Sequence, residues 1–84
     1  MTTADDVRQY AVTAIILPAK RRGMKTVTFS SSDVHNGMGL AERFPLVCSA
    51  IDAKKFEEFA GVLLVNRKGP KQSSTVKWTF EIAE

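Results

Sequence analysis

Apolar residues recur with a helical period at the start of the chain. They lie three and four positions apart: Val7, Tyr10, Ala11, Ala14 and Ile15. This spacing places them on one face and predicts an amphipathic helix, which Thr2 or Thr3 is expected to cap. We expect Pro18 to end or kink the helix near Leu17, because a proline disfavours helical backbone in the residue before it.

The pattern changes after the basic stretch that follows this helix. The run Thr26–Ser30 is rich in β-branched and aromatic residues and predicts a short strand. Ser31 or Ser32 is then expected to cap a second helix, which carries Val34 and Met38 four positions apart on one face.

A third helix is expected around Pro45, which a helix tolerates only in its first turn. It should begin near Glu42 to Phe44, and we expect Arg43–Phe56 to form one rod that continues toward Gly61. Its apolar positions predict a buried face: Leu46, Val47, Ala50, Ile51, Phe56 and Phe59. The helical step of 100° per residue turns the others outward: Pro45, Cys48, Ser49 and Asp52.

The last third of the chain has the period of two that is typical of strands. "VLLVN" predicts one strand, and "TVKWTFEI" predicts another with strict alternation. The residues expected to face inward are Val76, Trp78, Phe80 and Ile82. The connection Arg67–Ser74 is too long for a tight two-residue turn, so we expect it to project as a mobile loop.

Composition narrows the class of protein. The chain has 84 residues, 44% of them hydrophobic and 25% charged, with a net charge of +3. This predicts a single globular domain over residues 1–84 that is mildly basic. One cysteine, Cys48, excludes an intramolecular disulfide and a cysteine-based zinc site. With no signal peptide and no apolar run long enough for a membrane span, we expect a soluble, cytoplasmic protein.

Motifs for catalysis are missing from the sequence. It contains no P-loop, no dinucleotide-binding glycine motif and no nucleophile elbow. Glu57 and Glu58 are adjacent, so on a helix their carboxylates diverge. His35 has no second histidine with which to hold a metal, and we expect it to pack or cap locally. The sequence therefore predicts no enzyme and no cofactor.

The order of the predicted elements is helix, strand, helix, helix, strand, long loop and strand. It is similar to the winged helix-turn-helix family of DNA-binding domains. The resemblance is carried by the hairpin "VLLVNRKGPKQSSTVKWTF" and by six apolar or turn residues: Val34, Met38, Gly39, Leu40, Val47 and Ile51. It implies an α+β fold with three helices packed on a small antiparallel sheet and a β-hairpin wing. Val47 and Ile51 come eight and twelve positions after Gly39. The family's core residues come six and nine after its turn glycine, which predicts a turn one or two residues longer.

The same resemblance implies a function. In that family the second helix of the pair enters the major groove of double-stranded DNA, and the wing contacts the backbone or the minor groove. This implies a small regulator of transcription or an accessory factor. The sequence leaves open whether binding is sequence-specific.

Candidate DNA contacts follow from side-chain chemistry, since Lys and Arg neutralise phosphates. The candidates on the helix side are Arg43, Ser49, Asp52 and Lys55, and those of the wing are Arg67, Lys68, Lys71 and Gln72. Lys25, from the basic stretch before the first strand, is a further candidate. Ser49 and Asp52 could reach base edges, Asp52 through the amino group of cytosine, while Arg43 and Gln72 are the better base-reading candidates.

Two alternatives stay open at this level. The same surfaces could bind another protein, which the modest charge and the acidic Asp52 would fit. A homodimer is also open, with the apolar end of the first helix, "AIIL", as its interface. Ile16 and Leu17 would equally complete the core of a monomer, and the sequence does not decide between the two.

Overall fold

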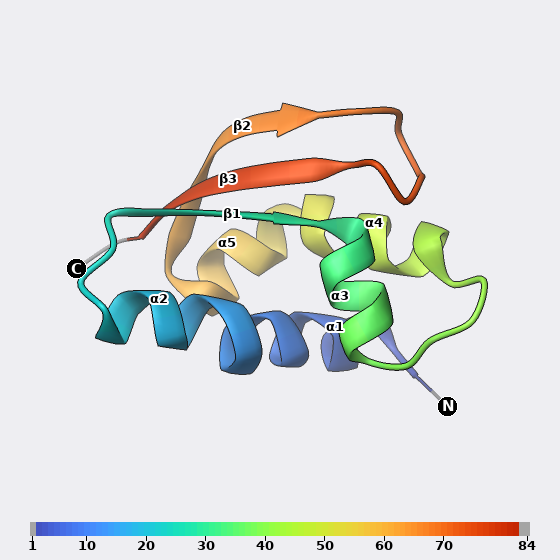
Figure 1. Cartoon of the computed structure of the whole chain (residues 1–84), viewed down its shortest axis with the longest axis horizontal. Helices are drawn as coiled ribbons and strands as arrows, with labels where there is room; N and C mark the ends of the chain where they lie inside the picture. The colour runs from blue at the N-terminus through green and yellow to red at the C-terminus, as the bar shows by residue number, and fades with distance from the viewer. Residues whose placement is uncertain (1, 83–84) are drawn as a thin grey trace.

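A three-stranded antiparallel sheet covers one side of a group of helices (Figure 1). This is the architecture of the computed structural model, which describes residues 2–82. The strands are β1 (Thr26–Ser30), β2 (Val62–Lys68) and β3 (Lys77–Ile82), in the order β1-β3-β2. The C-terminal strand is therefore central, and β2 and β3 form a hairpin. The α+β class is confirmed, as is the strand predicted over Thr26–Ser30.

The N-terminal helix runs past the point where the sequence predicts its end. It consists of α1 (Ala4–Ala11), a π-helical turn η1 (Val12–Ile16) and α2 (Leu17–Arg21), one after another. The amide of Leu17 donates to the carbonyl of Val12, five residues back. Such a widened turn is one way in which a helix accommodates a proline. Of the two outcomes expected at Pro18, an end or a kink near Leu17, the end was therefore wrong, and the regular α-helix is interrupted by the π-helical turn just before the proline.

Hydrogen-bonded caps begin two of the helices. At α1 the Thr3 hydroxyl accepts the Asp6 amide, and the Asp6 carboxylate accepts the Thr3 amide, at 3.2 and 2.9 Å. At α3 (Ser31–Gly37) the same exchange joins Ser30 and Asp33. The cap of α3 is therefore Ser30, not Ser31 or Ser32 as predicted. The reason is the three-residue spacing to Asp33, which completes a capping box.

The predicted rod is two helices, α4 (Phe44–Asp52) and α5 (Lys54–Ala60). Ala53 breaks it with extended backbone, φ −70° and ψ 138°. Alanine is the best helix former, so tertiary packing sets this break rather than local preference. The new direction of α5 brings Phe56 edge-on to Phe80, with ring centroids 5.2 Å apart. Phe59, predicted to be buried, is instead 51% exposed.

The core lies between the sheet and the helices. The alternation at the C-terminus predicts it correctly: Val76, Trp78, Phe80 and Ile82 are all buried. Phe29 of β1 packs on Trp78 and Phe80, with ring centroids 5.6 and 5.7 Å apart. Aromatic side chains of the two paired strands thus form the layer against which the helices pack.

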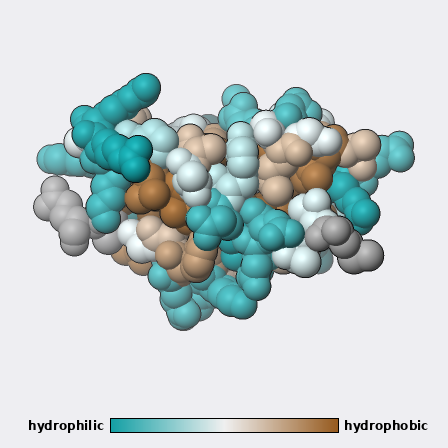
Figure 2. Space-filling view, turned by 90° about the horizontal axis from the view of Figure 1, so that it is seen from below, coloured by the Kyte–Doolittle hydropathy of each residue, from teal (hydrophilic) through white to brown (hydrophobic). Residues whose placement is uncertain are grey.

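The helical side of the molecule carries two hydrophobic areas, separated by hydrophilic residues (Figure 2). Where the π-helical turn meets α2, Ile16 belongs to the core, whereas Leu17 is 36% exposed. The predicted dimer interface thus keeps one of these two residues at the surface.

Within residues 2–82, no helix is long and apolar enough to cross a membrane.

Candidate nucleic-acid interface

The loop between β2 and β3, residues 69–76, folds back against the helices. The Ser31 hydroxyl and the Cys48 thiol both donate to the carbonyl of Ser73, the thiol at 3.7 Å. The Ser32 hydroxyl donates to the carbonyl of Ser74 at 2.7 Å. The loop predicted over Arg67–Ser74 is present but lies two residues later, over 69–76, and it is anchored to α3 and α4 instead of projecting freely.

Arg67 holds the other half of this loop. It lies on β2, not in the loop as predicted, and its guanidinium donates to both carboxylate oxygens of Asp52 at 2.7 and 3.0 Å. The same guanidinium donates to three successive carbonyls of the loop, those of Gly69, Pro70 and Lys71, at 3.2, 3.2 and 2.8 Å. The hydrogen bond to Asp52 raises the pKa of Arg67 above its already high usual value.

Asp52 is the acceptor that joins three elements. It ends α4, receives Arg67 from β2 and accepts the indole N–H of Trp78 from β3 at 2.7 Å. Bidentate hydrogen bonds between a guanidinium and a carboxylate are strong and fix geometry. Two residues that the sequence offers as DNA contacts therefore bind one another, and the negative charge of Asp52 is balanced within the protein.

The beginning of α4 is fixed by His35. Its Nε2 accepts the amide of Arg43 at 3.1 Å, and its ring stacks on Phe44 with centroids 3.9 Å apart. His35 is buried, so the prediction that it packs and caps locally is confirmed. The side chain of Arg43, at the start of the helix, is left at the surface.

The exposed stripe of α4 consists of Pro45, Ser49 and Asp52. The first two are small, so another surface can approach the helix closely. Cys48, predicted to lie on this side, is fully buried because the anchored loop covers it. Burial raises the pKa of its thiol.

Cations gather where the sheet meets the loop. Lys68 and Lys77 lie directly opposite each other across β2 and β3. Like charges in this position repel, so an anion between them would be favoured. Lys71 and Gln72 are exposed in the loop itself. Lys77 belongs to this group although it was not among the predicted contacts, and its outward place in the alternating strand was the available signal.

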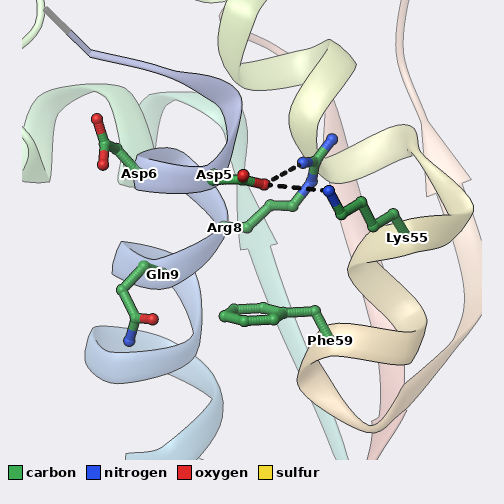
Figure 3. Close-up of a pocket in the computed structure, with 6 residues that line it drawn as sticks. All are labelled: Asp5, Asp6, Arg8, Gln9, Lys55 and Phe59. Carbon is green, nitrogen blue, oxygen red and sulfur yellow. Dashed lines mark hydrogen bonds and ion pairs between the residues drawn. The ribbon is translucent and has the colours of Figure 1, made fainter.

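Lys55 and Lys25 lie apart from this group. Lys55 contacts Asp5 at 3.6 Å in a pocket between α1 and α5, which Arg8 and Phe59 also line (Figure 3). Lys25 precedes β1 at the end where Thr26 pairs with Glu81, whereas the loop is at the end where Ser30 pairs with Lys77. The structure thus joins Asp52, Arg67 and Lys71 directly. Lys68 and Gln72 are their neighbours in the chain. Arg43 lies at the start of α4 and Ser49 within it, the helix that Asp52 ends, whereas Lys55 and Lys25 are not part of this group.

The residues that anchor the loop were not found from the sequence. Ser31 and Ser32 were read as caps, and Cys48 as an outward side chain. Once Ser30 is recognised as the cap, the next two serines are free for other partners, which was the available signal. Their acceptors, in "QSS", lie 42 residues further along the chain.

Comparisons with known proteins add no relative. No family model, no curated protein and no solved structure matches the chain. Among residues 2–82, no group of three or more His, Cys, Asp or Glu side chains is placed to hold a metal ion. The candidate interface is therefore argued from the geometry described above.

Proposed function

We propose that this chain is a double-stranded DNA-binding domain of the winged-helix type, acting as a regulator or an accessory factor. In this proposal α4 enters the major groove and the loop 69–76 contacts the backbone as the wing. The order of the elements and the strand order β1-β3-β2 are compatible with that fold.

The observation that carries the proposal is the anchoring of the loop beside α4. Contacts from Cys48 and from Asp52, through Arg67, tie the loop to the same helix that exposes Ser49. A duplex that meets the exposed stripe of α4 is then next to the wing. Since Arg67 balances Asp52, this acid does not oppose the approach of a phosphate.

The proposal divides the contacts by role. Lys68, Lys71 and Lys77 would neutralise phosphates, which gives affinity for any sequence. Arg43, at the start of α4, adds a fourth charge for the phosphates and is also a candidate for base edges, together with Ser49 on the helix side and Gln72 in the loop. The small exposed stripe of α4 favours binding that depends little on sequence.

Titration of a mixed-sequence duplex at several salt concentrations tests the proposal. Four phosphate contacts, from Arg43, Lys68, Lys71 and Lys77, give a slope of about −4 in log K against log salt concentration. Single-stranded DNA and RNA serve as competitors. A wild-type chain whose duplex affinity does not depend on salt, or that binds no duplex at low salt, contradicts the proposal.

Protein binding is a second candidate function, favoured by exposed apolar side chains on the edge strand β2. Leu63, Leu64 and Val65 on β2 are 59%, 39% and 58% exposed. A strand of another protein would not pair easily there. The Glu57 carboxylate already accepts the Leu64 amide at 2.9 Å, and the register of β2 shifts between Leu64 and Asn66.

A pull-down in high salt separates the two functions. A protein partner that stays bound there, together with no duplex binding at low salt, selects protein interaction. Sedimentation of the chain alone tests the homodimer, for which Leu17 is an exposed apolar residue at the predicted interface.

A further inference from the structure

We propose that the wing holds a preformed phosphate-binding site, made by the backbone amides of Lys71 and Gln72 with the ammonium groups of Lys68 and Lys71. In this site Arg67 is a positioning residue that shapes the loop and does not touch the phosphate. The inference rests on the proposed function and names the part of the wing that meets the DNA backbone.

The direction of the two amides follows from the carbonyls that Arg67 binds. Its guanidinium draws the carbonyl oxygens of Pro70 and Lys71 inward, at 3.2 and 2.8 Å. In a planar trans peptide the N–H of the next residue points opposite to the carbonyl. The amides of Lys71 and Gln72 therefore point away from Arg67.

Nothing within residues 2–82 accepts a hydrogen bond from these two amides. Both residues are exposed, so an incoming anion can reach the N–H groups. Successive backbone amides that point the same way are a common means of binding phosphate. The site thus has two neutral donors already aimed outward before any ligand arrives.

The charges around these amides favour an anion. Lys71 carries one of the two amides, and Lys68 ends β2 just before the loop. The stretch from Asn66 to Val76 contains three cations and no acidic residue. The third cation, Arg67, has its charge balanced by Asp52, so the two lysines supply the free positive charge.

Arg67 acts on this site through the loop. Five acceptor atoms surround its guanidinium: two on Asp52 and three on the loop backbone. A lysine has three donors on a single nitrogen and cannot reproduce this planar fork. Arg67→Lys therefore keeps the charge but should release the loop, which separates a positioning residue from a direct phosphate contact.

The test uses the full chain labelled with ¹⁵N and follows each backbone amide by NMR. Inorganic phosphate is titrated at constant ionic strength, and a mixed-sequence duplex is titrated separately. In the wild type we expect the amides of Lys71 and Gln72 to shift with both probes. Lys71→Met keeps the backbone amide but removes one ammonium group, and should weaken the response.

Arg67→Lys should remove the response of both amides to phosphate, because the released loop no longer aims them outward. It should weaken duplex binding by about tenfold, as expected for losing hydrogen bonds from these amides to a charged phosphate. Dispersed amide signals elsewhere show that the variant is folded. Arg21→Lys, an equivalent change on α2, is the matched control and should behave as the wild type.

Two results would overturn the inference. One is a wild type whose Lys71 and Gln72 amides do not move with phosphate. The other is an Arg67→Lys variant equal to the wild type in phosphate response and duplex affinity. A wild type that binds no duplex but shifts these amides with phosphate would overturn the proposed function and leave the anion site standing.

Discussion

Two segments of this chain carry cations at similar density, but they differ in how their cations contact the rest of the protein. The basic stretch that begins in the last turn of α2 has four in six residues: Lys20, Arg21, Arg22 and Lys25. All four are exposed, and within residues 2–82 their side chains make no hydrogen bond or ion pair. In the segment from Arg67 to Lys71, one cation organises the backbone that carries another. Charge density alone therefore does not identify a candidate nucleic-acid interface.

The two segments also lie at opposite ends of β1 (Figure 1). Only the wing segment is next to α4, because Arg67 bridges to Asp52. The proposed DNA contact is therefore placed at the wing and not at the basic stretch from Lys20 to Lys25.

The largest effect is expected from a pair of glycines, one in each segment. Gly69 has φ +104°, and an added Cβ would lie 3.0 Å from both the carbonyl oxygen of Thr75 and the Cα of Val76. Gly23 has φ +74° with nothing within 4 Å. Gly69→Ala should lower the free energy of unfolding by about 3 kcal/mol and Gly23→Ala by about 1 kcal/mol. Urea unfolding measures both, and equal losses would contradict the comparison.

The next effect concerns the carboxylate that ties the wing to α4. Asp52→Ala should lower the free energy of unfolding by about 2 kcal/mol, since it leaves the half-buried Arg67 and the indole N–H of Trp78 without their acceptor. Ser49→Ala in the same helix is the control and should change stability by less than about 0.5 kcal/mol. A loss for Asp52→Ala as small as the control's would mean that the wing is not held in this way.

A smaller effect is expected from pH, through the thiol under the wing. Burial raises the pKa of Cys48 above the value of about 8.5 for an unfolded chain. As the pH rises, the thiol of the unfolded chain loses its proton before the thiol of the folded chain does. The stability that the protonated, buried thiol contributes is therefore complete below about pH 8.5 and is lost as the pH rises toward the pKa of the folded state. The difference in unfolding free energy between wild type and Cys48→Ala should therefore shrink from pH 7 to pH 10. A constant difference would show that burial does not raise the pKa of the Cys48 thiol in the folded state.

The sheet could be predicted from the sequence, and most of the wing's structure could not. Period-two alternation fixes which side chains of β3 face inward, because neighbouring side chains on a strand point to opposite faces. The break at Ala53 arises from the packing of Phe56 on Phe80, which local preference does not encode. Likewise, Asp52 and Arg67 are 15 residues apart and read as two separate surface charges until the fold joins them.

The smallest change in stability is expected for the exposed lysines of the wing, which makes them suited to the central test. Two triple variants remove the same charge from the two segments: Lys68→Ala, Lys71→Ala and Lys77→Ala from the wing, and Lys20→Ala, Arg21→Ala and Arg22→Ala from α2 and the residue after it. Replacing Lys68 and Lys77 removes two like charges that lie opposite each other, so the wing variant should remain folded.

The salt dependence of duplex binding by these two variants is the most direct measurement of the central claim. The account predicts that the wing variant changes the slope of log K against log salt concentration from about −4 to about −1, because it loses three phosphate contacts. The α2 variant should keep a slope near −4. Equal slopes for the two variants, or a larger loss for the α2 variant, would contradict the claim that the anchored wing is the surface that binds DNA.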